Sequence, residues 1–276
     1  MLVWNWNRLT LNRMDRSIIR ISLQAITTLA GLLVVMFAPL ASAEQYDPIP
    51  HSTVAMANGA GIIKATLSCP TSRYAHVVLG DDIEAGCLAL EVEDGDVLVH
   101  QLPDNQVFED LVPHVADFDG NGTNDVAVVR SDNAYGAALA LYTIGENNEV
   151  EELGSTPPIG RANRWLAPVG VADFNGDDQP DIAYVQTPHI GGILKIWTFV
   201  DGTLEQIAQM RGFSNHSIGS TRVSTSKIAD RNNDGIMDIA LPDQRRQKTV
   251  WVTLSPKVSP ELHVIDELAY DKAYFE

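Results

Sequence analysis

The sequence predicts an all-β protein in which one small antiparallel sheet is repeated along the chain. Three observations predict it. A nine-residue acidic segment occurs three times at a nearly constant spacing, short runs of strand-forming residues surround each copy, and glycine, asparagine and aspartate separate those runs. Because the runs are short and either alternate or are wholly apolar, they indicate strands rather than helices.

The N-terminal segment 1–43 of the 276-residue chain has the pattern of an export signal. Arginines precede an apolar run at 21–40, and Ala-Ser-Ala at 41–43 fits a small-residue cleavage site. An uncleaved membrane anchor is the alternative, since the run is near spanning length, but Pro39 and the small residues favour cleavage. We expect a mature domain of residues 44–276 that is exported to the periplasm, the cell surface or the medium and has no membrane association after cleavage.

The mature part is strongly acidic. The chain has 19 Lys and Arg against 36 Asp and Glu, a net charge of −17, and the signal holds four of the basic residues and one of the acidic ones. The mature part therefore has a net charge of about −20, which argues against nucleic acid and anionic lipid as partners. Clustered acids favour cations instead.

Three acidic loops superimpose without gaps. They begin at Asp117, Asp173 and Asp230, which lie 56 and 57 residues apart. Each loop has oxygen-bearing side chains at positions 1, 3, 5 and 9. These side chains are Asp117, Asp119, Asn121 and Asp125 in the first loop, Asp173, Asn175, Asp177 and Asp181 in the second, and Asp230, Asn232, Asp234 and Asp238 in the third.

This donor set predicts calcium. The three carboxylates of each loop repel one another unless a cation lies between them, and a hard divalent ion takes roughly six to eight oxygen ligands. An oxygen-only set without His or Cys favours calcium over zinc or copper. A backbone carbonyl at position 7, from Thr123, Gln179 or Ile236, would complete each shell, so we expect about three bound Ca²⁺ ions.

An EF-hand and a solvated acidic turn are the alternatives to such a calcium loop. An EF-hand is excluded because its glutamate at position 12 is missing, with Val128, Tyr184 and Leu241 in its place, and because strand-like runs follow. A solvated turn could share this composition, since Asp, Asn and Gly are common in turns. Three copies in register favour the cation sites.

Each loop is surrounded by β runs in the same order. One run leads into the loop, one follows it directly, and two more complete the unit. The expected runs are 111–116, 125–129, 136–144 and 149–153, then 166–172, 181–185, 191–199 and 203–209, then 223–229, 238–242, 248–254 and 261–268. One unit is thus four short strands in about 56 residues, which is typical of a β-propeller blade.

A fourth, degenerate unit is expected before these three. Residues 75–92 parallel 125–142 at a shift of 50. The ligand positions then hold Leu67, Cys69, Thr71 and Ala75, so we expect no calcium there. Cys69 and Cys87 are the only cysteines, and an oxidising compartment favours a disulfide between them. We infer that this disulfide holds the first unit together in place of the ion that holds each of the other units together.

The loop pattern followed by an apolar strand resembles the FG-GAP and VCBS repeats, known from integrin α-subunit propellers and many exported bacterial proteins. The likeness covers units at about 55–108, 109–160, 161–215 and 216–270. It implies four-stranded β-propeller blades, with calcium held by the twelve side chains given above, and the units counted in the sequence make about four blades. Integrin-type propellers have more blades, so four blades could close alone or two chains could associate. Asp178 replaces the usual loop glycine, and Asp tolerates left-handed geometry.

The loops at the other ends of the strands concentrate arginine and aromatic residues. Arginine forks match carboxylates, and aromatic rings stack on sugars. The candidate ligand-binding residues are Arg161, Arg164, Trp165, His216 and Arg222. They favour a protein or an acidic glycan as partner, although long polar side chains are common in exposed loops anyway.

No catalytic motif is present: the chain lacks a G-x-S-x-G elbow, a phosphate-binding glycine loop and an H-E-x-x-H pair. The sequence therefore favours a binding module over an enzyme. One alternative is a polysaccharide lyase or hydrolase that uses arginine and His216 in these loops. Another is a structural module that assembles with other propeller chains, including copies of itself.

Overall fold

The computed structural model describes residues 46–56, 60–222, 225–255 and 260–275, so the predicted export signal lies outside the described residues. Strands and tight turns make up this part of the chain from Pro48 to Ala269, followed by one short 3-10 turn, Lys272–Phe275. All strand pairs between the named strands are antiparallel, which confirms the all-β prediction. No helix among the described residues is long and apolar enough to span a bilayer.

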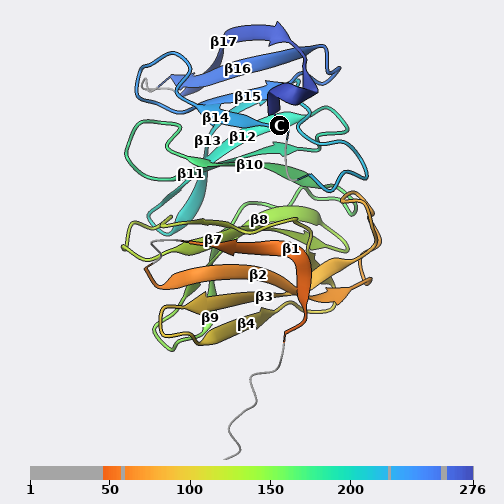
Figure 1. Cartoon of the computed structure of the whole chain (residues 1–276), viewed down its shortest axis with the longest axis vertical. Coiled ribbons are helices and arrows are strands. Elements are labelled where there is room, and N and C mark those ends of the chain that lie inside the picture. The colour runs from red at the N-terminus through yellow and green to blue at the C-terminus, as the bar shows by residue number, and fades with distance from the viewer. Residues whose placement is uncertain (1–45, 57–59, 223–224, 256–259, 276) are drawn as a thin grey trace, which may run out of the picture. The chain divides into compact units, whose positions relative to one another are not determined.

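Four units of four strands follow one another (Figure 1). The first unit contains β1 (Pro48–Ala55), β2 (Ile62–Thr71), β3 (Glu84–Val92) and β4 (Val97–Gln101). The second contains β6 (His114–Ala116), β7 (Asp125–Asp132), β8 (Gly136–Ile144) and β9 (Val150–Ser155). The third contains β10 (Leu166–Ala172), β11 (Asp181–Gln186), β12 (Ile193–Val200) and β13 (Thr203–Arg211). The fourth contains β14 (Lys227–Ala229), β15 (Asp238–Pro242), β16 (Lys248–Ser255) and β17 (Glu261–Ala269).

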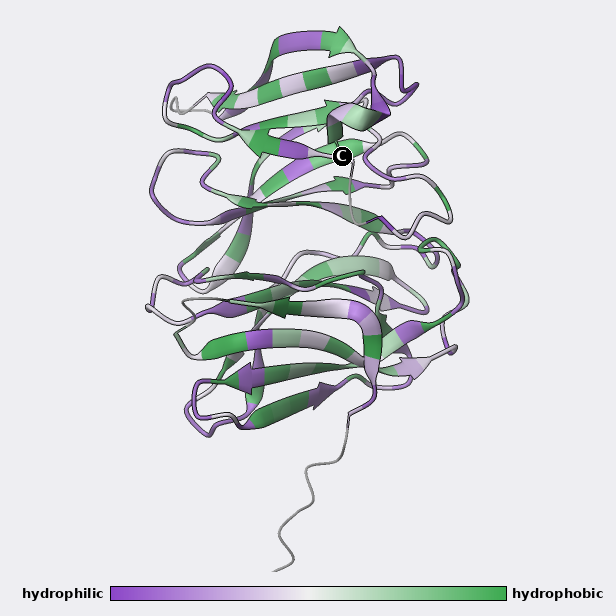
Figure 2. Ribbon diagram, in the orientation of Figure 1, coloured by the Kyte–Doolittle hydropathy of each residue, from purple (hydrophilic) through white to green (hydrophobic). Residues whose placement is uncertain are grey.

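The strands of the second, third and fourth units agree with the predicted runs to within a few residues. Within each unit the two middle strands are buried along most of their length, as expected for a sheet covered on both faces. The last strands, such as β13 and β17, carry more exposed polar residues. Figure 2 shows the same contrast between apolar central strands and hydrophilic loops.

The first two units differ from the prediction because a short extra strand joins them. This strand, β5 (Gln106–Phe108), pairs with β3 through Ala85 and Phe108 and with β7 through Gln106 and Asp132. The two units therefore form one nine-stranded sheet, whereas the third and fourth units remain separate four-stranded sheets.

Neighbouring units pack face to face through three hydrophobic clusters. Leu88 and Leu90 pack with Val128 between the first and second units. The second cluster joins the second and third units, and the third cluster joins the third and fourth. Among the described residues no such cluster joins the first unit to the fourth, so the expected closed propeller is not found.

The chain itself covers the outer face of the fourth unit. Trp251 of β16 is 2% exposed and its indole N–H donates to the Tyr274 hydroxyl at 3.1 Å. The Arg231 guanidinium lies 5.7 Å from the Trp251 ring centre, and the Lys227 ammonium lies 4.8 Å from that of Tyr274. Exposed sheet faces in stacked arrays are commonly closed by such a polar cover.

The residue after the first aspartate of each acidic loop also differs between the fourth unit and the two units before it. In the first two acidic loops it is Phe118 and Phe174, which are buried in the clusters between successive units. In the third loop it is Arg231, which is exposed and pairs with Asp266 at 2.7 Å. The apolar residue is thus replaced by a charged one in the fourth unit, on whose outer face no further sheet packs among the described residues.

The alignment predicted for the first unit is wrong. Residues 75–83 form no strand, and Leu67 and Cys69 lie inside β2 rather than in a loop. The pairs Ala55↔Lys64 and Ala116↔Asp125 show the true correspondence, a shift of 61 that sets "VAMANGAGIIKATLS" from Val54 against "VADFDGNGTNDVAVV" from Val115. The apolar run of β3 resembles that of β8 so closely that it obscures this correspondence in the sequence.

The disulfide between Cys69 and Cys87 is present, as predicted. It joins β2 to β3, beside the pair Ser68↔Cys87, and not the first strand of the unit to the second. The inference that it replaces an ion clamp is therefore wrong. Position 9 of the corresponding hairpin is Lys64, which forms an ion pair with Glu91 of β3.

Candidate metal centres and the opposite loops

The three acidic loops connect the first and second strands of the second, third and fourth units. Positions 4 and 6 of every loop have a left-handed backbone. The φ angles are 70° and 87° at Gly120 and Gly122, 80° and 64° at Gly176 and Asp178, and 60° and 89° at Asn233 and Gly235. Asp and Asn are the non-glycine residues that adopt this conformation most readily, as expected for Asp178.

The first aspartate of each loop holds the turn together in the same way. Its two carboxylate oxygens accept the backbone N–H groups of positions 5 and 6. The N···O distances are 3.0 and 2.9 Å for Asp117, 3.3 and 2.9 Å for Asp173, and 3.1 and 3.0 Å for Asp230. The side-chain oxygen at position 5 likewise accepts the N–H of position 7. Three separate sequences thus build one geometry.

The aspartate at position 9 is fully buried in all three loops, as Asp125, Asp181 and Asp238. One carboxylate oxygen of each accepts the N–H of position 2, at 3.0, 3.0 and 2.7 Å respectively. The other oxygen of Asp125 and of Asp238 accepts no hydrogen bond, and that of Asp181 has only a 3.5 Å contact with the Asn175 amide. Burial raises the pKa of Asp125 to about 6 and that of Asp181 to about 7.

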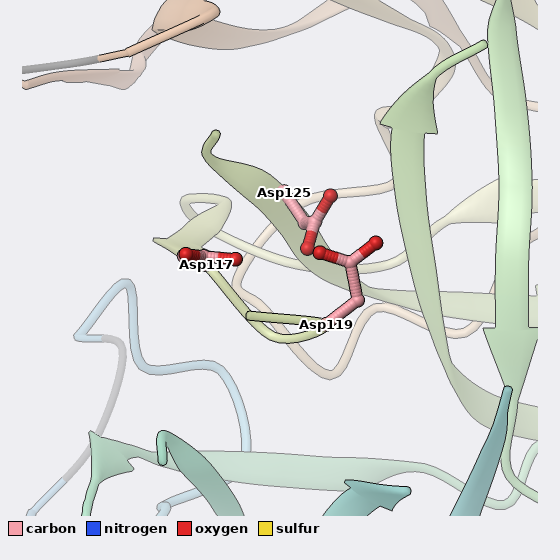
Figure 3. Close-up of side chains that lie close together, drawn as sticks. All are labelled: Asp117, Asp119 and Asp125. Atoms are coloured by element: carbon pink, nitrogen blue, oxygen red, sulfur yellow. The ribbon is translucent and has the colours of Figure 1, made fainter. Parts of the chain in front are cut away.

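The first loop brings three carboxylates together (Figure 3). One oxygen each of Asp117, Asp119 and Asp125 lies within 4.8 Å of the others. In the other two loops position 3 is an asparagine, whose amide N–H donates to the carboxylate at position 5: Asn175 to Asp177, and Asn232 to Asp234, both at 2.9 Å. In the first loop the amide is at position 5 instead, where the Asn121 side-chain N–H donates to Asp119 at 3.0 Å.

The donor chemistry fits a hard cation. Every side chain that converges in the loops offers oxygen, and the buried oxygens at position 9 lack the donors that buried carboxylates normally have. The loops are also neighbours, because a Cβ on Gly120 would lie 3.1 Å from Gln179 and one on Gly176 3.3 Å from Ile236. That the backbone carbonyls of Thr123, Gln179 and Ile236 coordinate the ion stays a prediction.

The loops at the opposite strand ends bring together part of the predicted ligand set. Arg164 and Trp165 line a cavity of about 240 Å³ with His189. Trp165 is 3% exposed and its indole N–H donates to the Glu109 carbonyl at 2.8 Å, so it packs in the core rather than offering a stacking surface. His216 contacts Trp165 edge to face at 4.8 Å between ring centres.

His216 is itself 2% exposed, and its ring nitrogens lie 3.2 Å from His189 and 3.0 Å from the Ser220 carbonyl. Burial lowers the pKa of His216 to about 4, so it is neutral at physiological pH. Arg161 and Arg222 are exposed and do not line the cavity. The wall also contains His76, Ile190 and Ile218, which were not predicted, although isoleucines in polar loops are a usable signal.

The comparisons with known proteins agree with the repeat. A family model described as an FG-GAP-like repeat matches residues 117–184. No curated protein sequence matches the chain. Solved structures that resemble it include the exotype rhamnogalacturonan lyase YesX (14% identity, TM-score 0.44, 79% of this chain and 50% of that one) and the rhamnogalacturonan lyase YesW (13%, 0.43, 82% and 55%).

A third is the Bacillus licheniformis rhamnogalacturonan lyase PL11, at 14% identity, a TM-score of 0.35, and coverage of 80% of this chain and 55% of that one. The chain therefore spans about half the length of these structures. The family match contains the first two acidic loops, from Asp117 to Asp125 and from Asp173 to Asp181. The chain thus contains FG-GAP-like repeat sequence in residues 117–184.

Proposed function

We propose that this chain is an exported calcium-binding interaction module that recognises a protein or an acidic glycan. Each of the three acidic loops would hold one calcium ion through its side chains at positions 1, 3, 5 and 9. When bound, the ion neutralises the carboxylates and ties the first strand of a unit to the second. The loops at the other strand ends would contact the partner.

The single observation that carries the calcium proposal is the buried oxygen at position 9. A carboxylate oxygen removed from water without a donor or a cation costs several kcal/mol. Asp125 and Asp238 each have such an oxygen, in loops whose other side chains converge on the same space. A divalent ion bound among the loop side chains would remove this cost.

The ion would also influence packing between units. Phe118 and Phe174 follow the first aspartate of their loops directly, and their N–H groups donate to Asp125 and Asp181. The same phenylalanines fill the clusters between neighbouring sheets. A loop fixed by calcium therefore holds an interface residue in place, which supports a role in stability rather than in chemistry.

Arg164 and the cavity that it lines support the choice of partner. The side chain is partly exposed beside Ile190 and Ile218, which are 61% and 73% exposed. A guanidinium next to exposed apolar groups suits a ligand that carries both a carboxylate and an apolar face. An acidic sugar residue and an acidic peptide segment both meet this description.

Metal analysis of the purified mature chain tests the calcium sites. We expect three ions per chain at millimolar calcium, and two after Asp173→Ala, since that side chain is both ligand and turn support. Glu205→Ala, which removes an exposed acid on β13, is the matched control and should keep three. A wild-type chain without calcium under these conditions overturns the proposal.

Binding to acidic glycans and acidic peptides tests the partner site. Arg164→Ala should weaken binding at least tenfold, whereas Arg245→Ala, an exposed arginine outside the cavity, should not. Turnover of the glycans would instead favour the alternative of a polysaccharide lyase or hydrolase. A change of solution mass on adding chelator would favour the structural assembly module.

A further inference from the structure

A second, larger cavity shares no lining residue with the sites described so far. It has a volume of about 520 Å³ and is bordered by the start of β1, the β2–β3 connection and the segment after β5. Ile49, Leu79 and Leu111 contribute apolar walls, and Asp81, Glu84 and Asp110 contribute carboxyl groups. No Lys or Arg lines it among the described residues, and His51 and Thr221 are its remaining polar residues.

Glu84 is the chemically unusual member of this wall. It is the first residue of β3 and is 2% exposed, yet its Oε1 atom accepts no hydrogen bond. Asp110 differs, because its two oxygens accept the N–H groups of Leu111 at 2.8 Å and Val129 at 3.1 Å. Asp110 is therefore held by the backbone, whereas Glu84, which also lines the cavity, has a buried acceptor without a donor.

The surroundings of Glu84 are acidic as well as buried. Glu109 lies behind it and is engaged by the His76 ring at 2.5 Å and by the Ser131 hydroxyl. Burial first, and then the charges of Glu109, Asp81 and Asp110, raise the pKa of Glu84 to about 9. Without a ligand Glu84 is therefore a neutral acid at pH 7, and a positive charge placed beside it would favour the carboxylate.

We propose that this cavity binds an alkylammonium group, with the charged nitrogen at Glu84 and the carbon chain along Ile49, Leu79 and Leu111. An amine supplies the hydrogen-bond donor that Oε1 lacks, and its alkyl part matches the apolar walls. A metal ion fits less well, because among the described residues only the Asp117 loop gathers three ligand side chains within 4.8 Å. This site rests on neither the calcium loops nor the Arg164 cavity.

Calorimetric titration of the calcium-loaded mature chain tests the proposal. The probes are 1,5-diaminopentane and Nα-acetyl-lysine methylamide, which distinguish a free amine from a peptide side chain, with 1-pentanol as the neutral comparison. We expect at least one amine to bind and the alcohol not to bind. Titrations at pH 7 in phosphate and in HEPES should show release of about one proton, because the bound ammonium ionises Glu84.

The sign of the pH dependence follows from the same coupling. The amine is already charged at pH 7, and the free protein must lose the Glu84 proton, so affinity should rise by up to about tenfold per unit as pH increases toward 9. The titratable groups that face Glu84 or line the cavity with it are Asp81, Glu109, Asp110, Tyr74 and His51. None of these groups reverses the direction of the pH dependence, because the charge of each becomes more negative or stays unchanged as the pH rises.

Glu84→Gln keeps the shape and removes the charge, and it should weaken amine binding more than tenfold and abolish proton release. Glu205→Gln, which removes an exposed acid of β13 outside the cavity, is the matched control and should keep both amine binding and proton release. Unchanged calcium stoichiometry in both variants separates this result from the calcium proposal. Absence of amine binding, equal binding of 1-pentanol, or wild-type affinity in Glu84→Gln overturns the inference.

Discussion

Lys64 faces Ala55 across the first hairpin of the first unit, and Asp125 faces Ala116 at the same place in the second unit. The backbone register is the same, but the charge is reversed. Lys64 supplies a positive charge of its own, which Glu91 on the next strand balances. Asp125 instead leaves a buried oxygen without a partner.

The difference shows two ways in which one repeat can complete its first hairpin. The first unit uses a side-chain cation and adds a disulfide between its second and third strands. The other three units keep clustered oxygen donors, which we propose are completed by an ion from solution. The first unit should therefore be indifferent to calcium, and the other three should not.

Removal of calcium is expected to have the largest effect. An ion that binds only the folded state adds about 2.7 kcal/mol per site at a hundredfold excess over its Kd, or about 8 kcal/mol for three sites. For a chain of this size the melting temperature should fall by roughly 15–30 °C in excess chelator. Hydrogen exchange should accelerate in the hairpins β6–β7, β10–β11 and β14–β15 and change least in β2–β3. Equal acceleration everywhere would contradict the comparison.

Loss of the disulfide should come next. Replacing Cys69 and Cys87 together with alanine should cost about 3 kcal/mol, as estimated from loop entropy for a span of this length. Chemical denaturation measures it, and the loss should be the same in calcium and in chelator. A loss that depends on calcium would couple the first unit to the ion sites.

A matched pair at position 9 sharpens the comparison further. Asp125→Asn should remove one ion and cost about 2–3 kcal/mol in calcium but little in chelator. Lys64→Gln should cost less than about 1 kcal/mol in both, since its ion pair is partly exposed. Unfolding curves of the two variants, each measured with and without calcium, give the four free energies of unfolding. A calcium-dependent loss in Lys64→Gln would refute the assignment of Lys64 as the positive charge of the first hairpin.

The smallest effect concerns the loop backbone. Asp178 has a φ of 64°, so Asp178→Gly should relieve strain and stabilise the chain by about 0.5 kcal/mol. Gly122→Ala, at the same position of the first loop, has open space for a Cβ but a φ of 87°, and should destabilise by about 1 kcal/mol. Thermal unfolding in calcium measures the stability change of each variant. If both variants changed stability in the same direction, backbone strain would not be the cause of the two changes.

Much of the second, third and fourth units could be predicted from sequence, because loop oxygens, glycines and alternating strands all repeat in register. The first unit could not be aligned correctly, since Met56 and Lys64 occupy ligand positions and no acidic residue marks its loop. The strand β5 and the missing closure were also not predictable. They depend on which residues meet across the fold, such as Phe108 with Ala85.

The candidate ligand site was predicted only in part for a related reason. Arg164 was recognised by its residue type. Whether an aromatic ring can contact a ligand depends on its burial, and Trp165 and His216 are both buried. Glu84 was not recognised at all, because a single glutamate at the start of a strand has no distinguishing pattern. Its missing hydrogen bond is visible only in three dimensions.

The position of Arg231 has a consequence for adding further repeats to the array. Where the earlier loops place a phenylalanine that the following sheet covers, this position holds a cation that lies over Trp251 and binds Asp266 on the same sheet. Lengthening the array by fusing another repeat would require Arg231→Phe and displacement of Tyr274, and grafting Arg231 into an earlier loop would put a charge into an apolar interface. Arg231 and Tyr274 together thus determine whether a further sheet could pack on the fourth unit.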